Sequence, residues 1–175
     1  MTAQGPATPE PSEALSDPRE LSLGFLDYLR STALRKIAGM DEADLRSSRL
    51  PSGWAPLELV QHLAYMERRW IEWGFAGEEV ADPWGDDDPA RGRWQVPSQE
   101  RTADVVARLE AVGQRTRTLV AGAQLTDRAR TGGRFAEGSV APTLGWILFH
   151  LLQEYARHVG QLDIVRELTD GEVGE

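Results

Sequence analysis

The segment that decides the fold is residues 145–163, GWILFHLLQEYARHVGQLD. Its apolar residues recur at helical spacing, which predicts an amphipathic helix with one buried face. His150, Glu154 and His158 follow one another at intervals of four residues, so on a helix they lie along a single stripe. Glutamate is rarely buried unless it is paired. A chemical reason is therefore needed for a buried helix face that carries His, Glu and His together.

Three further segments show the same helical pattern, at residues 17–39, 55–77 and 98–122, and the final helix is expected to span 142–168. Asp17 and Pro18 form a start signal for the first helix, and Pro56 begins the second. His62 lies within the apolar stripe of that second helix. Four amphipathic helices and no alternating strand pattern predict an all-α fold, a four-helix bundle.

The segments between the helices set the expected boundaries. Residues 1–16 are rich in Pro, Ala, Ser and Thr and are predicted to be a disordered arm. The bundle is predicted to span residues 17–170, and residues 171–175 are predicted to form a C-terminal tail. Residues 78–97 are crowded with Asp, Pro, Gly and Trp, so no regular structure is expected there. A connection of that length is usually a functional lid or disordered. The three aspartates at 86–88 are expected to be solvated.

Composition excludes several classes of function. The chain has no cysteine, so a disulfide, a cysteine nucleophile and a thiolate metal site are all ruled out. Its net charge of −9 argues against nucleic-acid binding, because no basic surface is available for phosphates. No apolar run reaches the ~20 residues that cross a bilayer, and the first residues do not resemble a secretion signal. A cytoplasmic protein is expected, with a homodimer as a further expectation.

The spacing of the stripe bears on metal binding. Residues four apart on a helix are ~6 Å apart along its axis and residues eight apart are ~12 Å apart. One ion can therefore take Glu154 with either His150 or His158, and the spacing alone does not choose. His62 is the only other histidine available for a third ligand. Two histidines and a carboxylate suit a catalytic zinc or a similar divalent ion, whereas the ordinary interpretation makes each histidine a hydrogen-bonded core residue.

Two stretches together carry a family resemblance: SGWAPLELVQHLAYMERRW at 52–70 and TLGWILFHLLQEYARHVGQLDIVREL at 143–168. The chain resembles the DinB-like superfamily over residues 20–170, and most of all the branch with mycothiol-dependent maleylpyruvate isomerases and S-transferases. The resemblance implies an up-down-down-up four-helix bundle with a divalent metal, zinc before nickel or manganese, on His62, Glu154 and His158. It also implies mycothiol or a similar low-molecular-weight thiol as co-substrate, together with an electrophilic acceptor.

Three more residues are candidates for the surroundings of this site. His150 lies one helical turn from Glu154. Its alternative roles are a contact for the substrate, a support for Glu154, and an ordinary core residue. Arg157 is a candidate contact for the thiol, against the alternative of a solvated helix face. Gln161 is three residues from His158 and is expected to orient its ring. The predicted function is thiol transfer or isomerisation. The alternatives are a metal-dependent hydrolase or lyase on the same site, and a non-catalytic helical binding module.

Overall fold

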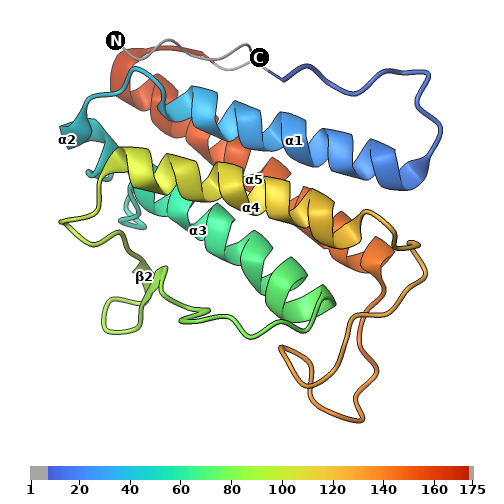
Figure 1. Ribbon diagram of the computed structural model, residues 1–175. Helices are drawn as coiled ribbons and strands as arrows, with labels where there is room; N and C mark the ends of the chain where they lie inside the picture. The colour runs from blue at the N-terminus through green and yellow to red at the C-terminus, as the bar shows by residue number, and fades with distance from the viewer. Residues whose placement is uncertain (1–7, 174–175) are drawn as a thin grey trace.

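Four long helices make up most of the structure, a computed structural model that describes residues 8–173 (Figure 1). They are α1 (Pro18–Ile37), α3 (Pro56–Trp70), α4 (Thr102–Val120) and α5 (Leu144–Asp170). A short helix, α2 (Glu42–Leu45), precedes α3, and a π-helical segment, η1 (Ile71–Phe75), continues it. Two strands, β1 (Asp87–Asp88) and β2 (Arg93–Trp94), lie between η1 and α4. The predicted all-α fold is confirmed.

The helix ends follow from local chemistry. The side chain of Asp17 accepts hydrogen bonds from the backbone N–H groups of Arg19 and Glu20, and so caps α1. Thr143 caps α5 in the same way, through the N–H of Trp146. Gly171 follows α5 with a φ of 78°, a left-handed conformation that glycine adopts without strain and that ends many helices.

The order of the helices sets the length of their connections. α1 and α5 run in one direction, and α3 and α4 run in the other (Figure 1). α1 packs chiefly on α5, and α3 chiefly on α4. Because α3 and α4 are parallel neighbours, the chain between them must return along the full length of α3 and η1, which is about 30 Å for this number of residues. The long connection at 76–101 is therefore a consequence of the topology.

This connection contains more regular structure than its composition predicts. β1 and β2 form a short antiparallel ladder in which Asp87 faces Trp94 and Asp88 faces Arg93. The turn between them is closed by the N–H groups of Arg91 and Gly92, which donate to the backbone oxygen of Asp88. Gly92 has a φ of 62°. The expectation that 78–97 holds no regular structure was therefore wrong over these four residues, because glycine allows the tight turn.

The apolar faces of the four helices meet in one core, which also contains a buried polar group. Glu67 of α3 is fully buried and accepts hydrogen bonds from Arg30 of α1, Thr116 of α4 and Tyr155 of α5. One carboxylate thus joins all four helices.

The ends of the chain add little to the bundle. Residues 1–7 of the predicted arm lie outside the described residues. Residues 8–16 run beside α1, where the backbone N–H of Thr8 donates to Ser31 Oγ; the disorder of the arm stays a prediction. In the described part of the chain, no helix is both long enough and apolar enough to span a membrane.

Candidate metal centre

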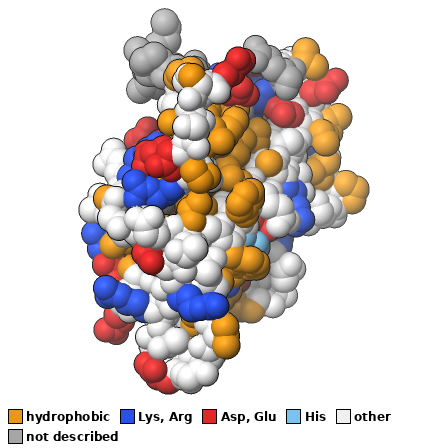
Figure 2. Space-filling model, turned by 90° about the vertical axis from the view of Figure 1, so that its right-hand side faces the viewer, with side chains coloured by type: hydrophobic (Ala, Val, Ile, Leu, Met, Phe, Trp, Pro, Cys, Tyr) orange, Lys and Arg blue, Asp and Glu red, His pale blue; other side chains and the backbone are white. Residues whose placement is uncertain are grey.

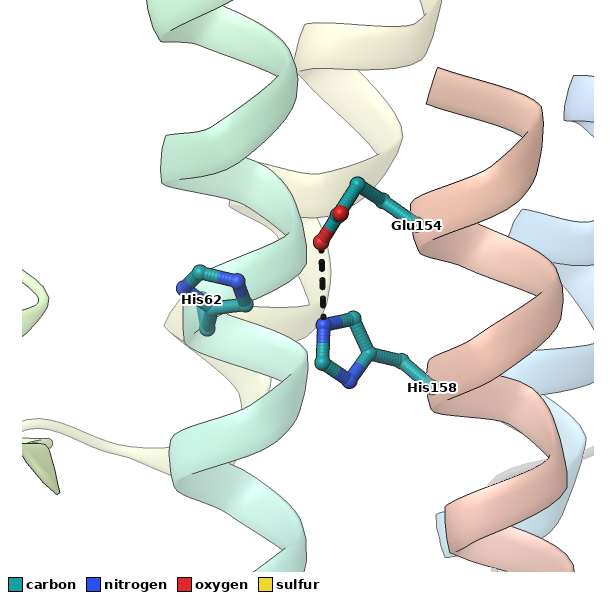
Figure 3. A group of neighbouring side chains, drawn as sticks. All are labelled: His62, Glu154 and His158. Atoms are coloured by element: carbon teal, nitrogen blue, oxygen red, sulfur yellow. Dashed lines mark ion pairs between the residues drawn. The ribbon is translucent and has the colours of Figure 1, made fainter. Parts of the chain in front are cut away.

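Three side chains from two helices converge in the bundle: His62 from α3, and Glu154 and His158 from α5 (Figure 3). Each has one possible ligand atom, and the three atoms lie within 4.8 Å of one another. Glu154 Oε2 is 3.3 Å from His158 Nε2. Ligand atoms ~2 Å from one zinc ion lie roughly 3–4 Å from each other, so the arrangement is close to what one ion requires. We call these three residues the triad.

The connection between η1 and α4 orients the first member of the triad. Asp86 Oδ2 lies 2.9 Å from His62 Nδ1, and Asp86 also accepts hydrogen bonds from Arg69. Burial alone would raise the pKa of Asp86, but the hydrogen bonds from His62 and Arg69 outweigh it, and the pKa lies below its ordinary value. Asp86 is therefore a carboxylate that accepts the Nδ1 proton, which leaves Nε2 of His62 for another partner.

The expectation that all three aspartates at 86–88 are solvated was wrong for Asp86. Asp86 has an exposed fraction of 0%, where a solvated loop residue was expected. The reason is tertiary: the returning connection carries Asp86 onto the guanidinium of Arg69, whose Nη1 also donates to the backbone oxygen of Pro83.

Trp94 covers the two histidine rings. Its ring stacks on His62 with 4.1 Å between centroids and an angle of 18°. The same ring meets His158 edge-on at 5.2 Å. The side chains of His62, Glu154 and His158 keep exposed fractions of 13%, 17% and 6%. The triad is therefore shielded but still reached by solvent, most of all at Glu154.

His158 is held by its own helix. Its Nδ1 lies 2.8 Å from the amide oxygen of Gln161, one turn further along α5. Burial is the main cause that lowers the pKa of His158 below its ordinary value. The ring is therefore neutral at pH 7, and Nδ1 donates to Gln161. Neutral imidazole with a free Nε2 is the form that binds metals.

The other two candidates lie outside the triad. His150 is half-buried, and its ring stacks on Trp146 at 5.3 Å and contacts Trp70 at 4.5 Å. Burial lowers the pKa of His150, and the negative charge of nearby Glu154 raises it and so offsets part of this effect. Arg157 is exposed on α5.

The donor set can be tested against the chemistry of a divalent ion. Nδ1 of each histidine is engaged, by Asp86 in one case and by Gln161 in the other, so both rings offer Nε2. Glu154 adds a carboxylate, so the set is two imidazoles and one oxygen ligand. Three protein ligands with further positions left open are the usual pattern of a catalytic zinc site. The residues fit such an ion.

The match to known families agrees with this site. The family model of mycothiol S-transferases matches residues 22–171, which include the four long helices almost entirely and all three members of the triad. The chain belongs to the mycothiol S-transferase family. It is accordingly a member of the DinB-like superfamily, as its sequence predicted. A comparison with curated proteins finds no match. Membership in the mycothiol S-transferase family implies a small-molecule thiol as substrate.

Proposed function

We propose that the protein is a metal-dependent thiol transferase in which His62, Glu154 and His158 hold one divalent ion. Zinc is the first expectation, and nickel or manganese the alternatives. The observation that carries the proposal is the convergence of the triad with both Nδ1 atoms already bonded. A hydrogen bond at Nδ1 is also found in core histidines, but two histidines and a carboxylate that bring one ligand atom each to within 4.8 Å of one another suit a single ion.

The thiol must come from solution, because the chain has no cysteine. Mycothiol or a similar low-molecular-weight thiol is the proposed co-substrate, which the family supports. A bound divalent ion acts as a Lewis acid and lowers the pKa of a coordinated thiol, as it lowers that of water to about 7. In the transfer to an unsaturated acceptor, the thiol loses its S–H proton and the sulfur bonds to the electrophilic carbon. The C=C π bond breaks, and the neighbouring carbon takes up a proton, so the product is a thioether. We place this reaction in the cytoplasm.

The residues of the chain have separate parts in this function. Asp86 and Gln161 keep the two imidazole rings in the tautomer that leaves Nε2 available. Trp94 covers both rings and so limits the access of water from the side of the connection. Glu154 is the most exposed member of the triad, and the acceptor and the thiol therefore approach on its side.

The first test is the metal content of the untagged protein. We expect about one divalent ion per chain in the parent. His62→Ala and Glu154→Ala should lose the ion and remain folded. His150→Ala is the matched control, since it removes a histidine from the same helix outside the triad, and it should keep the ion. A parent that binds neither zinc, nickel nor manganese would sink the proposal.

The second test is the requirement for a thiol. Purified protein is mixed with an electrophilic acceptor, with and without mycothiol, and the thioether product is measured. We expect turnover only with the thiol, and none in Glu154→Ala. Acceptor consumption without thiol, lost in the same variant, would indicate a hydrolase on this site in place of a transferase.

A further inference from the structure

Arg134, in the connection between α4 and α5, has an unusual environment. Its guanidinium lies over the ring of Trp70, 4.1 Å from the centroid, and about 6 Å from two other indole rings, those of Trp73 and Trp84 (6.0 and 5.9 Å). Within residues 8–173, its Nη1 atom is buried and has no hydrogen-bond partner. Burial and the charge of Arg69 lower the pKa of Arg134, the reverse of what a carboxylate partner does. One nitrogen of this half-buried guanidinium thus has no acceptor among the described residues, and a ligand could provide one.

The backbone holds Arg134 in this place. Its N–H donates to the oxygen of Trp73, and the N–H of Arg130 donates to the oxygen of Phe75, so the connection is tied to η1 at two points. The preceding Gly133 allows this close approach, because a Cβ there would lie 2.6 Å from the backbone oxygen of Trp73 and 3.2 Å from Gly77 Cα. π-Helical segments such as η1 are frequent at functional sites. The position of Arg134 is therefore built into the fold.

Arg134 lies beside α3 and α5, the two helices that carry the triad. Trp70 is eight residues from His62 on α3, which corresponds to ~12 Å along the axis. On α5, which runs the other way, His150 contacts Trp70 and precedes Glu154 by four residues. His150 is close enough to both charged groups that Glu154 and Arg134 shift its pKa in opposite directions. A small molecule could therefore contact the triad at one end and Arg134 at the other.

Exposed tryptophans lie beside Arg134 and His150: Trp84 is near the first and Trp146 stacks on the second. Trp84 and Trp146 keep exposed fractions of 48% and 52%. In the view of Figure 2, hydrophobic side chains form a band down the face, and a histidine is visible at its edge. Flat aromatic surface beside a cation suits a planar, unsaturated or aromatic acid.

We propose that Arg134 binds the carboxylate of the acceptor, with the acceptor's planar body against Trp70 and His150 and its electrophilic carbon toward the triad. This inference rests on the proposed function, and it assigns that function a substrate class: electrophiles that are planar carboxylic acids. A guanidinium suits the role because it can donate two parallel hydrogen bonds to one carboxylate.

The test compares trans-cinnamate with cinnamamide, which has the same planar body but no charge. Binding of each to the metal-loaded protein is measured by calorimetry. We expect cinnamate to bind at least ~10-fold more tightly, and Arg134→Gln to remove that preference. Arg130→Gln is the matched control, since Arg130 is an exposed arginine of the same connection, and it should keep the preference. A preference for cinnamate that survives in Arg134→Gln would overturn the inference.

Three further measurements test the role of Arg134. If Arg134→Gln does not fold, Arg134→Lys replaces it, and its preference should fall part of the way, because lysine lacks the paired donors. Cinnamate binding that vanishes in Glu154→Ala but persists in Arg134→Gln would place the carboxylate at the triad and overturn the inference. In the transfer assay, Arg134→Gln should raise KM for a carboxylate acceptor and leave KM for the thiol unchanged; the reverse would assign Arg134 to the thiol and overturn it.

The calorimetric measurement also separates this inference from the proposed function. Cinnamate binding needs neither a thiol nor turnover. If cinnamate binds through Arg134 but no thiol transfer occurs with any acceptor, the proposed function fails and the carboxylate site stands. If transfer occurs but Arg134→Gln binds cinnamate as the parent does, the function stands and the assignment of Arg134 fails.

Discussion

His62 Nδ1 and Asp86 Oδ2 lie 2.9 Å apart, although 24 residues separate them in the chain. The contact couples the connection between η1 and α4 to the candidate metal centre. Carboxylates that accept the second proton of a ligating histidine fix its tautomer and raise its basicity. Asp86 is therefore a positioning residue for the triad, in addition to its ion pair with Arg69.

Replacement of this carboxylate should weaken metal binding. We predict that Asp86→Asn lowers the affinity for zinc by roughly 10–100-fold, because a neutral amide supports the imidazole less well. The dissociation constant is measured by competition with a chromogenic chelator. Asp87→Asn is the control, since it makes the same chemical change at the next residue, and its affinity should equal that of the parent. Equal affinities in the two variants would show that Asp86 has no role in metal binding.

Metal removal should lower stability through the triad alone. An ion that binds only the folded state adds about 2.7 kcal/mol to the unfolding free energy at a free concentration of 100 times its dissociation constant. We therefore predict that zinc raises the thermal midpoint of the chelator-treated parent and that Glu154→Ala shows no such rise. The measurement is a thermal melt followed by circular dichroism. A rise of the same size in Glu154→Ala would place the ion elsewhere.

The helices could be predicted closely because their signals are local. The final helix was expected at residues 142–168 and spans Leu144–Asp170. Its start signal, its apolar spacing and Gly171 are all contained in the segment itself.

The surroundings of the site depend on contacts that are distant in sequence. Asp86 and Arg134 reach α3 and η1 from two connections, and neither residue has a local pattern that distinguishes it from a solvated loop residue. One signal was available for Asp86. Two parallel neighbouring helices require a connection that returns along one of them, so a long loop after the helix of His62 is expected to run beside that helix.

The buried pair of Arg30 and Glu67 depends on a glycine in the facing helix. A Cβ at Gly113 of α4 would lie 2.9 Å from Arg30 Nε and 3.0 Å from its Cδ and Cζ. Arg30 cannot move away, because its guanidinium is bonded to Glu67. We predict that Gly113→Ala destabilises the protein, with an overpacking cost of ~1–3 kcal/mol that outweighs a gain of at most about 1 kcal/mol in helix propensity.

Gly160 of α5 provides the matched comparison for this prediction. A Cβ there would meet nothing within 4 Å. Gly160→Ala should therefore raise the unfolding free energy by up to about 1 kcal/mol. Urea denaturation of both variants checks the two signs. Equal stabilities would mean that Arg30 is free to shift and that the space beside Gly113 is not required.

The ionised state of Glu67 makes a specific prediction about pH. Burial alone would raise the pKa of Glu67, but Arg30, Thr116 and Tyr155 outweigh it, so the pKa in the folded protein lies below the ordinary value of 4.5. A lowered pKa adds stability that is present above the unfolded pKa and is lost as the pH falls through the folded one. Glu67→Gln should therefore cost about 3 kcal/mol at pH 7, since it leaves Arg30 without its main buried partner. That difference should shrink only below about pH 4.5.

Urea denaturation of the parent and Glu67→Gln from pH 7 to pH 3 measures the difference directly. Glu110→Gln serves as the control, because Glu110 is an exposed carboxylate on α4. Its difference from the parent should stay within about 0.5 kcal/mol over the same range. If the stability difference between the parent and Glu67→Gln grows as the pH falls, Glu67 is protonated in the folded protein at neutral pH. That result would contradict a charged carboxylate that joins the four helices.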